Sequence, residues 1–222
     1  MTRLVLKLGG RIAEADAAEA LTLRAAGHDV VVVHGAGPQI TAEMERRGIE
    51  PSFVAGRRVT TPEVLEVVRE SLAEVNAAVC AAIGPDAVPL FGDAIGLRAE
   101  QVEALGLVGH ASPSAPPAVE EALAGGLIPV VAPLAAGPLN VNADEAAAAL
   151  AVGLGAERIV FLSDVPGVLM DGVVMEHITA ADADRMLSVG IFEGGIVPKL
   201  EAAVRAARGG VRAEIGATKV VA

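Results

Sequence analysis

Short, uninterrupted apolar runs alternate along this chain with longer stretches of helical periodicity. The clearest runs hold four or five residues rich in Val, Ile and Leu, at 4–8, 30–33, 88–91, 128–131 and 159–162. Because a strand covered on both faces has no polar side, such runs are typical of a parallel sheet between helices. We therefore expect an α/β protein, a three-layer αβα sandwich around a mainly parallel central sheet.

The helix with the clearest boundaries is expected from Pro62 to about Ile83. Thr61 can cap it, Pro62 suits its first turn, and Gly84 ends it. The segments 51–60, 93–108 and 168–176 change to short pieces with Gly turns, which we interpret as hairpins decorating the sheet. Further helices are expected at 15–26, 38–47, 118–124, 144–154, 180–188 and 198–208, and further strands at 211–215 and 219–221.

Composition excludes several classes of partner. The chain carries 17 basic and 28 acidic side chains, and its net charge of −11 repels nucleic acid. The uncharged stretch 122–143 is long enough to cross a membrane, but repeated Gly and Pro residues would break a lipid-facing helix. A single cysteine, Cys80, cannot form an internal disulfide, and the chain opens directly into a strand. We expect a cytoplasmic protein without nucleic-acid or membrane partners.

Lysine is rare, and two of the three lysines occupy positions that are unfavourable for a cation. Only Lys7, Lys199 and Lys219 occur, and the other non-histidine basic residues are arginine. Lys7 lies inside an apolar run, where an unpaired ammonium group is costly. Lys199 follows Pro198 in the first turn of an expected helix, where the helix dipole disfavours a cation. Because both placements oppose stability, we interpret Lys7 and Lys199 as site residues that meet an anion or carboxylate; the alternative is a snorkelling Lys7 and an exposed Lys199.

The segment 139–146, LNVNADEA, concentrates polar groups. In an extended segment Asn140 and Asn142 point to one face, where they could grip a ligand together. Alternatively, Asn142 caps the next helix, and Asp144 and Glu145 complement the helix dipole. Residue physics alone leaves both interpretations open.

Two adjacent arginines, Arg57 and Arg58, lie in the segment GRRVT. A guanidinium group suits a carboxylate ligand, and a solvated hairpin is the alternative. The residues alone do not decide whether Arg57 or Arg58 faces a ligand.

Glycine-rich turns follow two expected strands, KLGG at 7–10 and HGAG at 34–37, and a third strand ends LSDVPG at 162–167. Ligands of open α/β sheets gather at the carboxyl ends of strands, where bare backbone N–H groups can approach a phosphate. Neither GxxxxGK[ST] nor a complete GxGxxG occurs, so an ordinary tight turn is the alternative at each place.

Together and in this order, these segments resemble the amino acid kinase family. The motifs are KLGG at 7–10, HGAG at 34–37, GRRVT at 56–60, NVNAD at 140–144, LSDVPG at 162–167 and GGIVPK at 194–199. The similarity runs from Leu4 to about Arg208. Several short motifs in one order are far more specific than any one, and they are most similar to members that phosphorylate N-acetyl-L-glutamate.

The resemblance implies transfer of a phosphoryl group from ATP to the side-chain carboxylate of N-acetyl-L-glutamate, the acyl-phosphate step of arginine biosynthesis. Lys7 and Lys199 would flank the γ-phosphoryl group, and Asp144 would hold both ammonium groups. A carboxylate is already an anion and needs no general base, so positioning and charge neutralisation would carry the rate. Mg²⁺ would arrive on the nucleotide, since the sequence shows no dedicated carboxylate cage.

The same resemblance implies the binding residues. Arg58 would bind the other carboxylate of the acyl-amino acid, and Asn140 and Asn142 would recognise its amide and main-chain groups. The remaining implied contacts are backbone donors to the phosphates and the reacting carboxylate, Gly9, Gly10, Gly35 and Ala36, and residues on the nucleotide side, Ser163, Asp164 and Gly195.

The resemblance further implies two lobes that share one sheet, residues 1–155 for the amino acid and 156–222 for the nucleotide. Only twelve residues follow Gly210, where the family adds another helix, so the second lobe is shortened. The chain also lacks the N-terminal helix of arginine-inhibited hexameric members. We expect an arginine-insensitive homodimer packed through the helix 62–83. Ala36 departs from the usual glycine of the family.

Two alternatives stay open. One is a related kinase for an aminoadipate derivative on an acidic carrier protein, as in lysine biosynthesis, which the net charge of −11 disfavours. The other is a non-catalytic amino-acid or nucleotide sensor of the same fold, which retention of Lys7, Lys199 and Asp144 disfavours.

Overall fold

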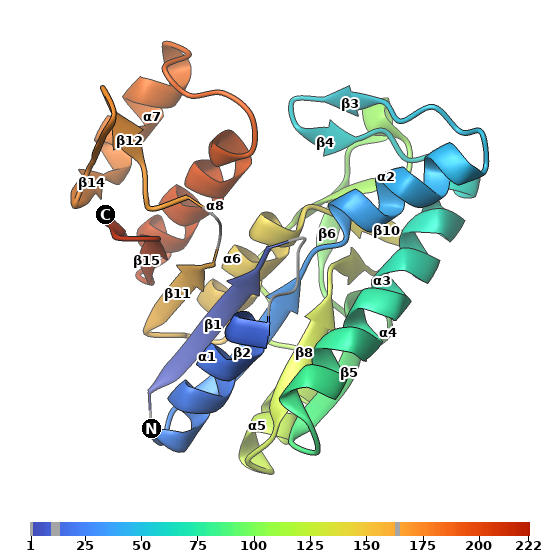
Figure 1. The fold of residues 1–222 in the computed structure, drawn as a ribbon, viewed down its shortest axis with the longest axis horizontal. Coiled ribbons are helices and arrows are strands. Elements are labelled where there is room, and N and C mark those ends of the chain that lie inside the picture. The colour runs from blue at the N-terminus through green and yellow to red at the C-terminus, as the bar shows by residue number, and fades with distance from the viewer. Residues whose placement is uncertain (1, 10–13, 163–164) are drawn as a thin grey trace.

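The computed structural model describes residues 2–9, 14–162 and 165–222. Gly10, Ser163 and Asp164, three of the positions expected to contact phosphate or nucleotide, lie outside the described residues. An eight-stranded sheet crosses the molecule (Figure 1). Its strands are β1 (Arg3–Leu8), β2 (Asp29–His34), β5 (Ala87–Phe91), β8 (Ile128–Ala132), β11 (Arg158–Phe161), β14 (His177–Thr179), β15 (Arg212–Ile215) and β16 (Thr218–Val221).

The strands lie in the order β14-β16-β15-β11-β1-β2-β8-β5. All neighbours pair in parallel except β15 and β16, which are antiparallel. The mainly parallel sheet expected from the apolar runs is therefore confirmed. The strands that precede residue 155 form one half of the sheet and those that follow it form the other half, and β1 meets β11 between them.

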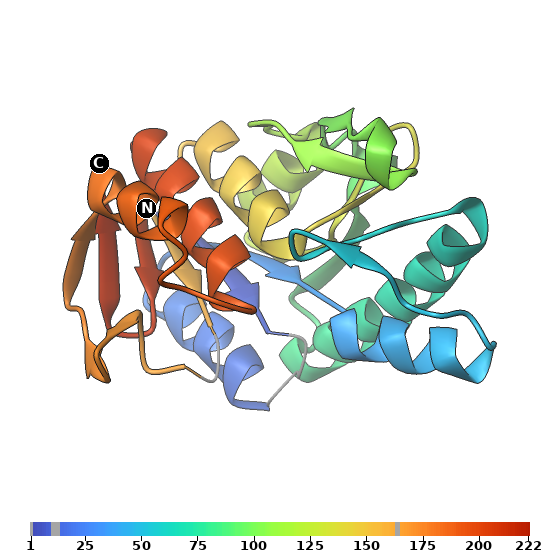
Figure 2. The same cartoon turned by 90° about the horizontal axis from the view of Figure 1, so that it is seen from above.

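Helices cover both faces of the sheet, which confirms the three-layer sandwich (Figure 2). On one face α1 (Glu14–Ala25), α2 (Gly37–Arg46) and α3 (Pro62–Ile83) pack with even-numbered β1 residues such as Leu6. On the other face, α5 (Pro117–Ala124), α6 (Ala143–Gly153), α7 (Ala180–Ser188) and α8 (Ile196–Arg208) pack with odd-numbered ones such as Val5. Because side chains alternate along a strand, Lys7 shares the face of Val5 and lies toward α6.

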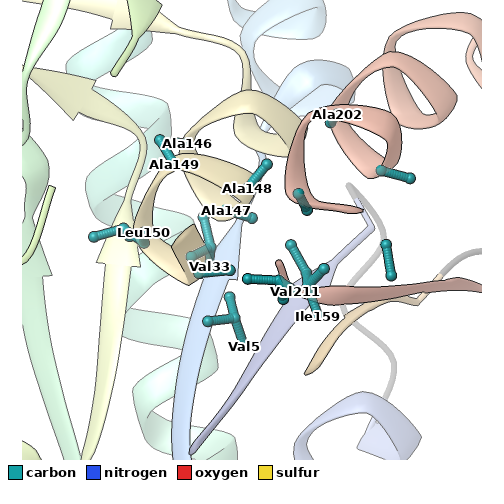
Figure 3. Close-up of a cluster of buried hydrophobic side chains, with 14 of the residues drawn as sticks. Val5, Val33, Ala146, Ala147, Ala148, Ala149, Leu150, Ile159, Ala202 and Val211 are labelled. Atoms are coloured by element: carbon teal, nitrogen blue, oxygen red, sulfur yellow. The ribbon is translucent and has the colours of Figure 1, made fainter. Parts of the chain in front are cut away.

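Alanine lets α6 pack closely on its neighbours. Its buried residues include Ala146, Ala147, Ala148 and Ala149, which lie among strand residues and Ala202 of α8 in Figure 3. Small side chains at a helix contact reduce the distance between the helix axes. The close contact between α6 and α8 brings the first turns of these two helices together, and those turns carry Asp144 and Lys199.

Short strands decorate the sandwich. The expected hairpins at 51–60 and 168–176 are present as β3 (Phe53–Val54) with β4 (Arg57–Arg58) and β12 (Leu169–Met170) with β13 (Val173–Val174). The hairpin expected at 93–108 is only partly right, because α4 (Gly92–Ile95) and a 3-10 helix, η1 (Glu103–Leu105), interrupt it. A separate small sheet joins β6 (Ala99–Gln101), β7 (Val108–Ala111), β10 (Leu139–Val141) and β9 (Leu134–Ala135).

The boundaries of α3 follow the expected capping. The Thr61 side chain accepts a hydrogen bond from the Val64 amide at 3.2 Å, and Gly84 ends the helix with a φ of 92° that favours glycine. Within the described residues, no helix combines the length and the apolar character that a membrane crossing requires.

Candidate active site

A cavity of about 270 Å³ lies at the carboxyl ends of β1 and β2, and the β3–β4 hairpin contributes to its wall. This is the sheet edge where open α/β proteins bind their ligands. The lining residues include seven of the thirteen predicted site residues: Lys7, Gly35, Ala36, Arg58, Asn140, Asn142 and Asp144. Lys199 is not among the lining residues, but it contacts Asp144, which is.

Two lysines from distant parts of the chain meet one carboxylate. Lys7 Nζ lies 2.8 Å from Asp144 Oδ1, and Lys199 Nζ lies 3.3 Å from the same oxygen. Each of the three side chains is only 9% exposed. One carboxylate between two ammonium groups leaves a net positive charge beside the cavity, and such a pair of cations suits a ligand with several negative charges.

Burial disfavours the charged form of Lys199. Desolvation lowers the pKa of Lys199, and the nearby charge of Lys7 lowers it further, whereas Asp144 raises it. The ammonium group also lies 5.6 Å from the centre of the Phe161 ring. Removal of Asp144 would therefore leave two buried cations without their shared partner.

The two adjacent arginines divide their roles. Arg57 donates to Glu145 Oε1 through Nε at 2.9 Å and Nη2 at 2.6 Å, so its charge is neutralised within the protein. Arg58 is 8% exposed, and it donates hydrogen bonds to neutral groups, Gly37 O, Thr41 Oγ1 and Met44 Sδ. Among the described residues Arg58 has no acidic partner, and burial lowers its pKa. An anionic ligand in the cavity would neutralise this charge.

Asn140 is oriented by a threonine. Thr60 Oγ1 donates to the carbonyl of Arg58 at 2.9 Å and accepts from Asn140 Nδ2 at 3.0 Å. Because the Thr60 proton is already used, the Asn140 group that faces Thr60 must be the amide nitrogen. Asn140 Oδ1 is thus the atom left to accept from a ligand N–H.

Asn142 caps α6 and also lines the cavity, so the two interpretations of its sequence position are compatible. Its Oδ1 accepts from the backbone N–H groups of Asp144 at 2.8 Å and Glu145 at 3.2 Å. Since backbone N–H groups can only donate, the side-chain nitrogen of Asn142 is left for a ligand acceptor. Asn140 and Asn142 therefore offer opposite hydrogen-bonding groups.

A buried histidine supports the turn after β2. His34 is fully buried, its Nε2 lies 3.0 Å from Asn76 Nδ2, and Asn76 also donates to Val130 O at 3.0 Å. Desolvation lowers the pKa of His34 to about 4, against a smaller opposing effect of the Gly35 carbonyl. His34 is therefore a neutral side chain at neutral pH that fixes the start of the turn Gly35–Ala36.

The predicted nucleotide-side positions are only partly described. Gly9 follows β1, and Gly195 is the residue before the first turn of α8, the helix that carries Lys199. Neither lines the cavity.

Sequence reasoning missed a buried carboxylate next to Asp144 and the partly exposed basic side chains that contact it. Glu145 is 4% exposed and contacts Arg57, His110 and Arg205. These partners come from β4, β7 and α8, far apart in sequence, and an acidic residue in a first helical turn is ordinary. The sequence offered two signals, the acidic pair Asp144-Glu145 and the basic pair Arg57-Arg58. Neither signal shows that Glu145 pairs with Arg57.

The described residues contain no group of three or more His, Cys, Asp or Glu side chains suited to a metal ion.

The chain belongs to the amino acid kinase family, because the profile of that family matches residues 2–216. Its sequence is 42% identical to the acetylglutamate kinase of Rubrobacter xylanophilus, over 97% of this chain and 88% of that protein. It is also 42% identical to the acetylglutamate kinase of Acidothermus cellulolyticus, over 95% of this chain and 81% of that protein.

Solved structures share the fold. The structure of smu.665 from Streptococcus mutans UA159 superposes with a TM-score of 0.88 at 26% identity, over 99% of this chain and 98% of that one. The structure of N-acetylglutamate synthase from Neisseria gonorrhoeae, in complex with coenzyme A and N-acetyl-glutamate, superposes with a TM-score of 0.85 at 25% identity. The match covers 100% of this chain and 59% of that one. Carbamate kinase from Giardia lamblia, bound to AMP-PNP, superposes with a TM-score of 0.74 at 16% identity, over 99% of this chain and 98% of that one. At this identity the match shows a shared fold only.

Proposed function

We propose that this chain transfers the γ-phosphoryl group of ATP to the side-chain carboxylate of N-acetyl-L-glutamate. Membership of the amino acid kinase family and the two acetylglutamate kinases at 42% identity support this assignment. The structural observation that carries it is the shared contact of Lys7 and Lys199 with Asp144, beside a cavity that also contains the unneutralised Arg58.

The acceptor binds through groups of opposite character. Arg58 pairs with the α-carboxylate, which neutralises a cation that has no acidic partner among the described residues. Asn140 Oδ1 accepts from the N–H of the acetylated amine, and the side-chain nitrogen of Asn142 donates to a carbonyl or carboxylate oxygen. An acylated amine offers one N–H and no positive charge, which matches this arrangement better than a free amino group does.

The reaction needs charge stabilisation more than proton transfer. A carboxylate oxygen attacks the γ-phosphorus, the bond from phosphorus to the β–γ bridging oxygen breaks, and ADP leaves with the electron pair. Lys7 and Lys199 stabilise the negative charge on the transferred group, and Asp144 positions both ammonium groups. A cation 4 Å from a charged oxygen contributes about 4 kcal/mol at an effective dielectric of 20, before desolvation is subtracted.

The nucleotide is assigned to residues 156–222, and the acceptor to residues 1–155. Ser163, Asp164 and Gly195 are the proposed contacts on the nucleotide side, and Gly9, Gly10, Gly35 and Ala36 are the proposed backbone donors to the phosphates and the reacting carboxylate. Bound Mg²⁺ would neutralise phosphate charge. Mg²⁺ usually keeps several waters and binds largely through substrate phosphates, so we propose that the ion arrives with the nucleotide.

We further propose a cytoplasmic homodimer that packs through α3. The outward side of α3 carries the exposed residues Ala73, Ala77 and Ala78, which present little side-chain bulk to a partner helix. Ala78→Arg should convert a dimer to a monomer in light scattering coupled to gel filtration, while Ala81→Arg nearer the helix end serves as a comparison. A wild-type chain that elutes as a monomer at all concentrations contradicts the dimer.

A hydroxylamine trap tests the function. Purified protein and MgATP are mixed with N-acetylglutamate, glutamate or N-acetyl-aminoadipate, and the acyl phosphate is captured as a hydroxamate. We expect turnover with N-acetylglutamate and none in Lys7→Ala. Preference for the aminoadipate derivative would favour the lysine-pathway kinase, and binding of N-acetylglutamate without turnover would favour a sensor.

A further inference from the structure

Glu145 is a buried carboxylate that basic side chains from three different elements contact. Its side chain is 3% exposed, and Oε1 accepts from Arg57 at 2.6 and 2.9 Å, with Arg205 Nη2 at 3.7 Å. The other oxygen, Oε2, makes no hydrogen bond of standard geometry among the described residues, and His110 Nδ1 lies 3.0 Å from it. A carboxylate is buried in this way only when its partners neutralise it.

His110 links two of these partners. Arg205 Nη1, which can only donate, lies 2.9 Å from His110 Nε2. Arg205 Nη1 also lies 3.2 Å from His110 Nδ1, and Arg57 Nη2 lies 3.2 Å from the same nitrogen. The chain of contacts runs from Arg205 through His110 to Glu145 and on to Arg57.

The four residues connect three of the elements that carry proposed reacting or binding side chains, β4, α6 and α8. Arg57 precedes Arg58 in β4, Glu145 follows Asp144 in α6, and Arg205 lies on α8 with Lys199. The hairpin also approaches α8 directly, because a β-carbon at Gly56 would lie 3.9 Å from Pro198 Cγ. Figure 2 shows the β3–β4 hairpin extending toward α8 above the sheet.

We propose that Arg57, His110, Glu145 and Arg205 form a positioning cluster that holds the β3–β4 hairpin against α6 and α8. None of the four is assigned to the reacting atoms. Because Arg57 and Arg58 are consecutive, the Arg57–Glu145 ion pair fixes the backbone that aims Arg58 into the cavity. The cluster thereby positions Arg58 relative to the Lys7–Asp144–Lys199 group before the acceptor binds.

The effect on binding depends on the fraction of molecules in which the β3–β4 hairpin lies against α6 and α8, which we call the closed hairpin. If the hairpin is closed in only a fraction of molecules, the apparent affinity for the acceptor falls by that fraction. Loss of the cluster therefore raises the acceptor KM, and it leaves the MgATP KM unchanged because none of the proposed nucleotide contacts lies in the hairpin. This kinetic consequence rests on the proposed function.

The kinetic test compares Arg57→Ala, Glu145→Gln and the double variant. We expect the acceptor KM to rise about tenfold in each single variant, with kcat changed less than about threefold. The double variant should resemble a single one, because both changes remove the same ion pair. Arg158→Ala is the control, since the Arg158 side chain is 29% exposed against 24% for Arg57 and pairs with Glu214 at 3.3 Å, away from the cavity. An unchanged acceptor KM, or additive effects, would overturn the proposal.

Hydrogen–deuterium exchange without substrate gives a readout independent of turnover. Amides of residues 53–59 should exchange faster in Arg57→Ala and Glu145→Gln than in wild type and Arg158→Ala, whereas amides of β1 and β2 should not change. Equal protection of the hairpin in all four proteins refutes the cluster. If wild type does not turn over N-acetylglutamate, the proposed function fails, and the exchange data still decide whether these residues hold the hairpin.

Discussion

Lys7 and Lys199 contact the same atom, Oδ1 of Asp144, at 2.8 and 3.3 Å. Lys7 comes from the first strand of the sheet and Lys199 from the last helix, so the carboxylate joins the two halves of the chain. Neither lysine has a stabilising position in its own element. Their shared partner explains both placements, and it makes Asp144 the residue on which the site depends.

Asp144→Asn should lower kcat at least about 100-fold, because both ammonium groups lose the charge that positions them. It should also destabilise the fold by about 3 kcal/mol, since two buried cations are left unpaired. Single-turnover kinetics and urea unfolding measure the two effects. Glu201→Gln, on the exposed side of α8, is the control for loss of one acidic charge. A kcat within threefold of wild type would contradict the role of Asp144.

Arg58→Ala should raise the KM for N-acetylglutamate about 100-fold and leave the MgATP KM within about twofold, because a charge-assisted pair is lost only on the acceptor side. Arg58→Lys should recover little, since an ammonium group lacks the planar fork of a guanidinium. Without substrate, Arg58→Ala should unfold no earlier than wild type, because it removes a buried cation without an acidic partner. Loss of unliganded stability with normal acceptor binding would show that Arg58 is structural.

Thr60→Val should raise the acceptor KM about three- to tenfold, because Asn140 Nδ2 loses its acceptor and the side-chain amide is free to rotate. Thr60→Ser keeps the hydroxyl and should behave as wild type. Initial rates at varied N-acetylglutamate give the comparison. Equal KM values for the Val and Ser variants would rule out this orienting role.

His34 should make stability sensitive to acid. Its pKa in the folded protein is about 4, below the value of about 6.5 in the unfolded chain, so the unfolded state binds the proton first as pH falls. The stabilisation is complete above pH 6.5, and about 1.4 kcal/mol is lost per pH unit below it, up to about 3 kcal/mol at pH 4.

Urea unfolding at pH 7, 6 and 5 tests this prediction with His34→Gln. The variant should be less stable at pH 7 but should lose less stability on acidification than wild type does. His177→Gln, at an exposed position of β14, is the control. Identical slopes for wild type and His34→Gln would contradict a buried neutral His34.

The amino-acid sequence determined the sandwich and its main elements. Strands covered on both faces must be apolar throughout, so β1, β2, β5, β8 and β11 were visible as continuous runs. The caps of α3 were also readable, because Thr61 and Gly84 act on their own neighbours. The unfavourable positions of Lys7 and Lys199 predicted a site but not its geometry. The cost of an unpaired cation can be recognised in the sequence, whereas the partner that offsets this cost cannot.

Only the tertiary structure decided which groups meet. Local physics does not distinguish Arg57 from Arg58, and both line the cavity, but Glu145 neutralises Arg57 and leaves Arg58 for a ligand. The orientation of Asn140 depends on Thr60, and the contacts of Glu145 come from three distant elements. Such pairings arise from packing between segments that are far apart in the chain, whereas local patterns report the burial and capping of single elements. The fold was therefore encoded locally, and the site was assembled by packing.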